Sequence, residues 1–424
     1  MLLKTLLNRV HPVKGFVYGM MKLVQDDSLP NGTRLEVQLR SRAGSKGICS
    51  GCGRAGATYD HLAARDFDFV PLWGIAVTLV YALRRIDCRA CGVKVERVPW
   101  CDAASKSPMT TALMVFLARW ARLLSWCQVA RVFAVSWESV YRAVEQVVDY
   151  GLKHRDLSGI GAIGVDEVAY AKGHKYLTLV YQLDGEKRRL LHVSQGRSVR
   201  GLLGFFRMLK KAKVDYARTI RFVCSDMWKA YLKVIAKKLP GALHILDRYH
   251  IVANLNKALD QVRAEEARKL AQEGWDVLKR SRWLLLRRRK RLSGKQRFKL
   301  RQILQWDLRT VRAYILVDGL QAMWEYRSAS HAGKFLDAWC RQTMRSRLEP
   351  LKKVARSLRQ HRELILNWYR AKKQYNAGIV EAMNLLVKLR FRKAFGFRTF
   401  AAMEVALYHQ LGHLPEPKLT HEFC

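Results

Sequence analysis

Three aspartates occupy the same kind of position, directly after a short run of mostly apolar or β-branched residues. They are Asp166 after residues 161–165, Asp226 after residues 219–225, and Asp247 after residues 242–246. Such runs are typical of buried strands, so each carboxylate is expected at or near a strand end. Carboxylates on neighbouring strand ends can bind a divalent metal ion together. For Asp166 taken alone, the alternative is a surface acid in a turn.

A fourth acid, Glu381, lies in a segment with helical spacing, residues 375–388. Glu381, Asn384 and Lys388 recur at i, i+3 and i+7 and are expected on one side of that helix. The apolar side is predicted to consist of Ile379, Met383 and Leu386. An acid beside an amide and an ammonium suits a polar site, and an ordinary salt bridge on a helix surface is the alternative.

Four cysteines form two Cys-x-x-Cys pairs, each followed by glycine. They are Cys49, Cys52, Cys88 and Cys91. Four thiolates at this spacing can bind one Zn²⁺ tetrahedrally. The intervening residues 67–72 and 77–81 read as strands, which suggests a zinc ribbon with structural zinc. Buried or redox-active thiols are the alternative, and His61 is a competing ligand candidate.

The strand that must position Asp166 continues into a hairpin. Asp184-Gly185 is a strong turn signal between residues 175–183 and a third strand at 188–194. The order from there is three strands, helix, strand, helix, strand, helix. That is the order of a ribonuclease H-like α/β fold, whose first and fourth strands are neighbours. Asp166 and Asp226 are therefore expected to share a metal site.

Residues 105–153 have helical spacing interrupted by a short turn. A helix over 126–133 is followed by Ser136, a suitable N-cap for the next helix over 137–148. This pattern fits a helix-turn-helix domain. The residues that would then face DNA are Glu138, Ser139 and Arg142. An ordinary helical hairpin is the alternative.

Residues 264–374 carry almost no strand signal and are predicted to form a basic, all-α insertion along the DNA backbone. The densest cationic stretch is Arg287, Arg288, Arg289, Lys290 and Arg291. The tryptophans expected to pack the core of this segment are Trp275, Trp283, Trp306, Trp324 and Trp339. A charged face that is merely solvated is the alternative.

The totals favour a nucleic-acid partner. The 424 residues include 77 Lys and Arg against 35 Asp and Glu, a net charge of +42. That excess indicates a polyanion. An anionic membrane surface is the alternative, but the longest apolar run, residues 72–83, is too short to cross a bilayer. We therefore expect a cytoplasmic protein that works on the nucleoid and has no membrane partner.

Taken in order, these motifs resemble those of the DDE transposases of bacterial insertion sequences, specifically the ISL3 family. The motifs are the cysteine pairs, the helix-turn-helix, Gly164-Val-Asp166-Glu, Ser225-Asp226-Met, Asp247-Arg-Tyr-His250 and Asn376-Ala-Gly-Ile-Val-Glu381-x-x-Asn384. The likeness covers residues 35–410, and the ordered set is specific although each motif alone is weak. Ala382 departs from the glycine expected there, and Tyr249 from phenylalanine.

The resemblance implies that Asp166, Asp226 and Glu381 are a catalytic triad that holds two Mg²⁺ (or Mn²⁺) ions. It also implies that the ribbon and the helix-turn-helix read the terminal inverted repeats of the element. Water would cleave the element ends, and the freed 3′-OH would attack target DNA with no covalent protein–DNA bond. Because two ends must be joined, a homodimer or a larger assembly on double-stranded DNA is expected.

Further residues are expected around this site. Asp247, His250 and Asn384 are candidates for orienting metal ligands or holding the scissile phosphate. A structural strand-end cap is the alternative for Asp247 and His250. The cations on the helix after Glu381 that are expected to contact DNA are Lys388, Arg390 and Arg392.

The expected domain order follows from these assignments. It is a zinc ribbon with an N-terminal segment in 1–100, a helix-turn-helix domain in 101–155, the first part of a ribonuclease H-like core in 156–263, the all-α insertion in 264–374, and the C-terminal helices of the core in 375–424. Three other functions are compatible with parts of the pattern: a nuclease of the same fold without strand transfer, a catalytically inactive DNA-binding regulator, and an RNA-binding protein.

Overall fold

The computed structural model describes residues 3–101, 108–186, 188–375, 378–419 and 421, and it contains two compact units. Unit 1 comprises Met1–Asp156 and Arg390–Cys424, and unit 2 comprises Leu157–Leu389. The boundary at residue 389 falls within helix α15 (Gly378–Lys393). The segment 375–424, which we expected to be one part of the core, is therefore divided between the two units.

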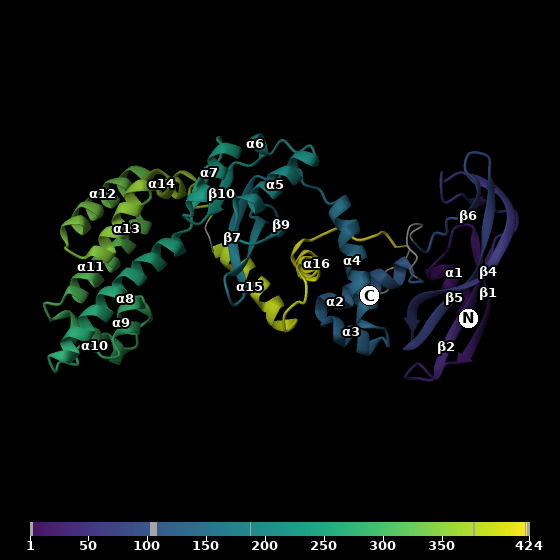
Figure 1. The fold of residues 1–424 in the computed structure, drawn as a ribbon, viewed down its shortest axis with the longest axis horizontal. Helices are drawn as coiled ribbons and strands as arrows, with labels where there is room; N and C mark the ends of the chain where they lie inside the picture. The colour runs from purple at the N-terminus through teal and green to yellow at the C-terminus, as the bar shows by residue number, and fades with distance from the viewer. Residues whose placement is uncertain (1–2, 102–107, 187, 376–377, 420, 422–424) are drawn as a thin grey trace. The chain divides into compact units, whose positions relative to one another are not determined.

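Unit 1 begins with a short helix and a six-stranded sheet. These elements are α1 (Leu3–Val10), β1 (Phe16–Gln25), β2 (Thr33–Ser41), β3 (Gly47–Ile48), β4 (Ala55–Leu72), β5 (Ile75–Cys88) and β6 (Gly92–Val95). The order is β1-β2-β5-β4-β3, and β6 pairs with β5 (Figure 1). The strands expected at 67–72 and 77–81 are thus parts of one long hairpin.

A two-residue turn folds that hairpin back on itself. Leu72 pairs with Ile75, and both intervening residues, Trp73 and Gly74, have positive φ. Two positive φ values match the twist of the flanking strands and give a tight reversal. The start of β4 and the end of β5 therefore lie side by side, where Ala57 pairs with Asp87.

Four helices complete unit 1. They are α2 (Thr111–Leu123), α3 (Trp126–Val132), α4 (Trp137–His154) and α16 (Phe400–Leu411). Ser136 caps α4, because its side chain accepts a hydrogen bond from the backbone N–H of Ser139, as predicted. Between α3 and α4 the chain reverses at Ala134, which has positive φ. The valines of α4, such as Val140 and Val144, are fully buried.

Unit 2 contains a five-stranded sheet of mixed direction. Its strands are β7 (Ala162–Ala171), β8 (Lys175–Gln182), β9 (Arg189–Gln195), β10 (Phe222–Ser225) and β11 (Leu243–Leu246), and their order is β11-β10-β7-β8-β9. β7, β8 and β9 are antiparallel, and β10 is parallel to both β7 and β11. The predicted pairing of the first and fourth strands, β7 and β10, is confirmed.

The two faces of this sheet are covered differently. On one face, Ile163 and Val165 pack in a core with α5 (Val199–Lys211) and α7 (Lys229–Lys238), and α6 (Tyr216–Thr219) links α5 to β10. Gly164 and Asp166 alternate with them and face the other side. A Cβ built on Gly164 would approach Val380 Cγ2 to 2.5 Å, so α15 covers this second face closely.

The position of Asp166 within β7 corrects one expectation. We expected it at or near the end of its strand, but β7 continues to Ala171. The reason is that β8 still pairs with β7 beyond this point, with Leu179 opposite Asp166. Only the parallel neighbour ends here, because Ser225 is the last residue of β10.

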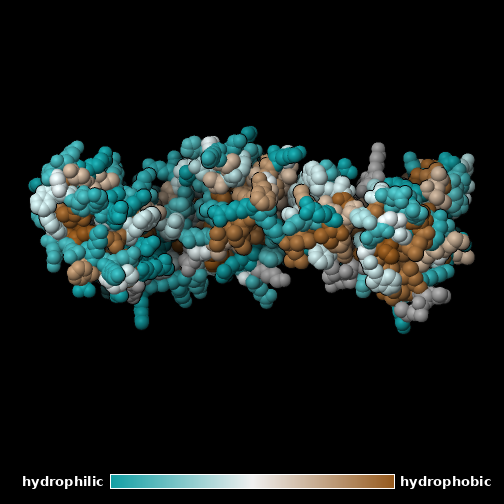
Figure 2. Space-filling model, turned by 90° about the horizontal axis from the view of Figure 1, so that it is seen from below, coloured by the Kyte–Doolittle hydropathy of each residue, from teal (hydrophilic) through white to brown (hydrophobic). Residues whose placement is uncertain are grey.

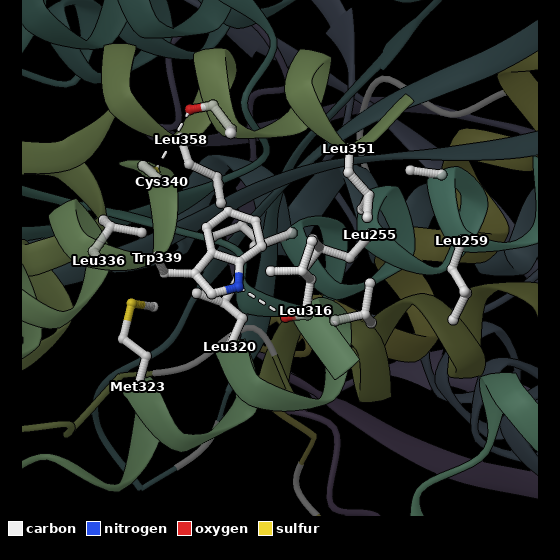
Figure 3. Packing of buried hydrophobic residues seen from close by; sticks show 14 of the residues in the cluster. Leu255, Leu259, Leu316, Leu320, Met323, Leu336, Trp339, Cys340, Leu351 and Leu358 are labelled. Atoms are coloured by element: carbon white, nitrogen blue, oxygen red, sulfur yellow. Dashed lines mark hydrogen bonds between the residues drawn. The ribbon is translucent and has the colours of Figure 1, made fainter. Parts of the chain in front are cut away.

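Residues 248–374 form a helical bundle, whose long first helix α8 runs the length of the bundle (Figure 1). Its helices are α8 (Arg248–Gln272), α9 (Arg282–Leu286), η1 (Arg289–Arg291), α10 (Gly294–Leu304), α11 (Arg309–Leu320), η2 (Gln321–Glu325), α12 (Ala329–Arg345), α13 (Glu349–Gln360) and α14 (Arg362–Arg370). At the centre, the indole Nε1 of Trp339 donates to the carbonyl of Leu316 over 2.7 Å (Figure 3). Leu255 and Leu259 of α8 pack in the same core (Figure 3).

The expectation that five tryptophans pack the core of this segment is only partly correct. Trp324 and Trp339 are buried. The exposed tryptophans are Trp275, Trp283 and Trp306. On the face shown in Figure 2, hydrophilic residues make up most of the visible surface of the bundle, at the left.

Candidate active site and cysteine cluster

The register of the parallel strands brings three aspartates to one level. Cys224 pairs with Gly164, so two residues further along each strand Asp226 is level with Asp166. Ser225 pairs with Leu246, so one residue further Asp226 is level with Asp247. Residues level with one another in parallel strands project to the same face. The three aspartates therefore form a row across β7, β10 and β11, in which Asp166 bonds to Asn384 of α15 and Asp226 pairs with Arg197.

Asp166 is held by hydrogen bonds from two directions. Its Oδ1 accepts the backbone N–H of Glu167 at 2.8 Å, and its Oδ2 accepts Nδ2 of Asn384 at 2.6 Å. Asn384 in turn accepts the hydroxyl of Tyr181 at 2.8 Å, and Tyr181 is fully buried. This series of hydrogen bonds fixes α15 against β7 and β8.

The same contact explains where Glu381 lies. Glu381 is one turn before Asn384 in α15, and it is close enough to Asp247 to raise the pKa of that group. The buried residues of α15 include Val380 and Val387 together with Met383 and Asn384. Our prediction that Leu386 belongs to the apolar side is wrong, because Leu386 is exposed. Asn384 lies on the buried side of α15 instead, where it bonds to residues of the sheet. Asn376 of the predicted motif lies outside the described residues.

Arg197, in the turn between β9 and α5, was not predicted from the sequence. It bridges two acids, with Nε 3.1 Å from Glu167 Oε2 and an amino nitrogen 3.1 Å from Asp226 Oδ2. Its guanidinium also lies 4.7 Å from the ring centre of Trp228. In the sequence, Arg197 is one cation among many, and nothing local distinguishes it. Tyr181 was also not predicted, although the sequence contains a weak indication of its role. A tyrosine inside an apolar strand needs a hydrogen-bond partner for its hydroxyl.

Asp247 joins the sheet to the bundle. Its Oδ1 accepts the backbone N–H of Tyr249 at 2.7 Å, which caps α8, and its Oδ2 lies 3.5 Å from Nε2 of His250. The cap that we considered as an alternative role is thus present. The same carboxyl also interacts with Asp166 and Glu381, so capping does not remove it from the acidic row.

The electrostatics of the row suit a divalent cation. Burial raises the pKa of Asp166, and the nearby Asp226 adds to that shift. Burial likewise raises the pKa of Asp247 to about 6 and that of Glu167 to about 6. Carboxyl groups that are buried together repel one another when ionised. Their oxygen atoms are the ligands that Mg²⁺ and Mn²⁺ prefer, so the donor set fits such an ion.

The four predicted zinc ligands come together at the end of the β4–β5 hairpin. Their sulfur atoms all lie within 4.8 Å of one another, and those of Cys52 and Cys88 are 3.4 Å apart. A tetrahedral Zn²⁺ with bonds of about 2.3 Å would place its sulfurs about 3.8 Å apart. Hydrogen bonding to Cys52 raises the pKa of Cys91 to about 12, so this thiol resists ionisation without a cation. The donor set and spacing fit zinc.

Glycine follows each cysteine pair for a conformational reason. Gly53 and Gly92 have φ of 72° and 68°, which L side chains rarely adopt. The carbonyl of Cys49 accepts the N–H of Gly53 at 2.9 Å, which closes the first turn around its sulfurs.

The predicted DNA-contacting residues lie in different settings. Glu138 and Arg142 of α4 are exposed, whereas Ser139 is half-buried and its N–H takes part in the Ser136 cap. In the cationic stretch, Arg287, Arg288, Arg289 and Arg291 are exposed, and the side chain of Lys290 lies outside what the structure describes. On α15, Lys388 and Arg392 are exposed, whereas Arg390 is half-buried and burial lowers its pKa.

None of the helices formed by the described residues combines the length and apolar character needed to cross a membrane.

Comparisons with known proteins relate the chain to transposases. A family model described as "Transposase" (DDE_Tnp_ISL3) matches residues 163–407. The transposase of insertion sequence IS1001 from Bordetella parapertussis is 29% identical over 355 residues, which cover 83% of this chain and 85% of that protein. The transposase of IS1557 from Mycobacterium tuberculosis is 27% identical over 421 residues, 92% of each. The Drosophila P element transposase strand transfer complex matches with a TM-score of 0.36 and 11% identity, over 73% of this chain and 93% of that one.

Proposed function

Because this chain belongs to the ISL3 family of DDE transposases, we propose that it binds the terminal inverted repeats of an insertion sequence, cleaves the DNA at the element ends and joins the 3′-OH ends to target DNA. The observation that carries this proposal is the row of carboxyl groups in unit 2. Helix α15 brings a fourth acid, Glu381, and is bound to the row by the hydrogen bond from Asn384 to Asp166.

In this proposal Asp166, Asp226 and Glu381 are the catalytic residues that hold Mg²⁺ or Mn²⁺. When bound, such ions make an attacking water more acidic and stabilise charge on the leaving 3′ oxygen. The raised pKa values of Asp166 and Asp247 support a site whose charge is completed by a cation. Asn384 keeps Asp166 oriented, and the pair Asp247–His250 fixes the start of α8 beside the row.

The remaining predicted sites are proposed to stabilise the fold or to bind DNA. A structural zinc ion at Cys49, Cys52, Cys88 and Cys91 would stabilise the end of the β4–β5 hairpin. We propose that α3 and α4 form a helix-turn-helix that reads the inverted repeats through Glu138, Ser139 and Arg142. The helical bundle is proposed as an insertion whose cations follow the DNA backbone. A homodimer or larger assembly would pair the two ends.

Amide substitutions test the catalytic assignment. Asp226→Asn keeps the size of the side chain but removes one metal-binding charge. We expect cleavage of a labelled DNA that carries the element end to fall by at least about 10²-fold, since metal ions contribute several kcal/mol to the transition state. The matched control is Asp276→Asn, because Asp276 is an exposed acid of the bundle that pairs only with Lys279 among the ion pairs described. Cleavage by Asp226→Asn at the rate of the control would show the assignment to be wrong.

Two alternatives are separated by a second assay. A nuclease of the same fold would cleave but would not join pre-cleaved 3′-OH ends to a target plasmid. An inactive regulator would shift the inverted repeat in a gel and cleave nothing with Mg²⁺ or Mn²⁺. All four acids are present, and Asp247 interacts with both Asp166 and Glu381, which favours an active transposase over the regulator.

A further inference from the structure

A groove of 500 Å³ runs beside α8 in unit 2, and no part of the proposed chemistry uses it. Its lining includes two aromatic and three cationic side chains, with one amide: Tyr249, Asn256, Lys257, Arg282, Trp283 and Arg287. The lining comes from α8 and from the α9 region.

The two aromatic rings of the groove are unusually open to solvent. Tyr249 is 60% exposed and Trp283 is 61% exposed. Trp283 precedes Leu284 and Leu285, which are buried, so the helix α9 is anchored while this ring points outward. Only the guanidinium of Arg282 stacks near it, 5.1 Å from the ring centre, among the cation–ring contacts of the described residues. Large rings held at the surface by buried neighbours are available to stack with a ligand.

The charge of the groove selects an anionic ligand. Lys257, Arg282 and Arg287 face a single acid, Asp260. Asp260 is already paired, with Arg282 at 2.9 Å and with Arg263 at 2.7 Å. Lys257 and Arg287 are exposed and make no ion pair among the described side chains. The groove therefore carries an excess of positive charge beside its aromatic rings.

The groove starts next to the acidic row. Asp247 caps α8, and Tyr249 is two residues later with its ring 6.0 Å from that of His250. Tyr249, Asn256 and Asp260 follow one stripe of α8, next to the buried stripe that contains Leu255 and Leu259. From Tyr249 to Asp260 the helix rises about 16 Å. At about 3.4 Å per stacked nucleotide, that length accommodates roughly five nucleotides.

We propose that this groove binds unpaired nucleotides of the DNA substrate as they leave the acidic row. The bases stack on Tyr249 and Trp283, and the phosphates lie against Lys257 and Arg287. A base pair inside a duplex has both faces covered by its neighbours, so exposed rings in a groove select unpaired bases. This inference deepens the proposed function, on which it rests for the identity of the substrate.

The test compares single-stranded and duplex DNA. Full-length protein is titrated without added Mg²⁺ or Mn²⁺ against a fluorescein-labelled 12-nucleotide single strand and its blunt duplex, at a salt concentration that suppresses phosphate-driven binding. The groove variants are Tyr249→Ala and Trp283→Ala. The matched control is Trp73→Ala, because Trp73 is 81% exposed and lies in the β4–β5 turn. Trp283→Phe keeps an aromatic face and serves as a rescue.

Each groove variant is expected to bind the single strand roughly 5- to 150-fold more weakly, the range for loss of one base–aromatic stack. Duplex affinity should change by less than about twofold. Trp73→Ala and Trp283→Phe should remain near wild type. The proposal is overturned if the groove variants bind the single strand as tightly as Trp73→Ala, or if they lose single-strand and duplex affinity by the same factor.

The result is independent of the catalytic assignment. Binding without Mg²⁺ or Mn²⁺ does not require cleavage, so a protein with no catalytic activity would still show the loss in the groove variants. Conversely, the wild-type protein could be shown to cleave and join DNA while the groove variants bind single strands as tightly as it does. Only the groove proposal would then fail.

Discussion

The hydrogen-bond chain from Tyr181 through Asn384 to Asp166 makes a quantitative prediction. Asn384→Ala removes both bonds and leaves the hydroxyl of a fully buried tyrosine without that partner. A hydrogen bond to a charged carboxylate contributes about 1.5–3 kcal/mol, and a neutral one about 0.5–1.5 kcal/mol. We therefore expect Asn384→Ala to destabilise the contact between α15 and the sheet by about 2–4.5 kcal/mol.

Native-state hydrogen exchange of the β7 and β8 amides is the suitable assay, because a chain with two compact units need not unfold in one step. Cleavage of an element-end DNA should fall by about 10²-fold in parallel, since Glu381 is positioned by the same helix. The control is Asn254→Ala, which removes an exposed amide from α8.

A double mutant isolates the buried hydroxyl. Adding Tyr181→Phe to Asn384→Ala removes the unpaired group and should recover roughly 1 kcal/mol, although Tyr181→Phe alone destabilises the wild type. The reasoning is refuted if Asn384→Ala changes the protection of β7 by less than about 0.5 kcal/mol, the range of ordinary surface substitutions. It is also refuted if the two substitutions are simply additive.

Three further predictions concern packing, metal and pH. Gly164→Ala should push α15 away from the sheet, because the new Cβ would lie 2.5 Å from Val380 Cγ2. DNA cleavage should therefore fall more than in Val380→Ala, and the double variant should recover part of the activity. A double variant with no recovery would argue against this contact. Purified protein should contain one zinc ion per chain by mass spectrometry, and Cys52→Ser should lose it. The control is Cys127→Ser, because Cys127 is exposed and lies outside the cluster. Equal zinc content in both variants would exclude the cluster as the site. Burial lowers the pKa of His409 to about 3, so the neutral form is favoured in the fold, and stability is fully present above the unfolded pKa near 6.5 and is lost as pH falls towards 3. Between pH 7.5 and 5.5 the free energy that protects the α16 amides from hydrogen exchange should fall by about 1.4 kcal/mol because of this group. His409→Leu should lack that loss, and an equal loss in the variant would contradict the assignment.

Several parts of the fold could be predicted because the signals are local. Ser136 caps α4 as predicted, since a cap depends on residues three apart in the chain. The cysteine pairs with their glycines indicated a shared ion, and the hairpin between them brings the sulfurs together. The apolar runs before Asp226 and Asp247 identified β10 and β11 to within a few residues.

Other features could not be predicted because local periodicity does not say what an element packs against. Helical spacing in α15 is satisfied equally well by an apolar side with Leu386 or with Asn384. The sheet decides for Asn384, because Asp166 and Tyr181 supply partners that offset its burial. Trp283 reads as a core residue from its type alone, yet its neighbours fill the core and leave it exposed.

The sequence by itself determined which residue types could do chemistry, the order in which they occur and the family to which the chain belongs. Only the tertiary structure decided that Asp166, Asp226 and Asp247 are level, that Arg197 bridges Glu167 and Asp226, and that aromatic rings line a groove beginning beside this row. The physical reason is that strand register and helix docking are fixed by contacts between residues far apart in the chain. A residue's neighbours in sequence restrict its conformation, but they do not choose its partners in space.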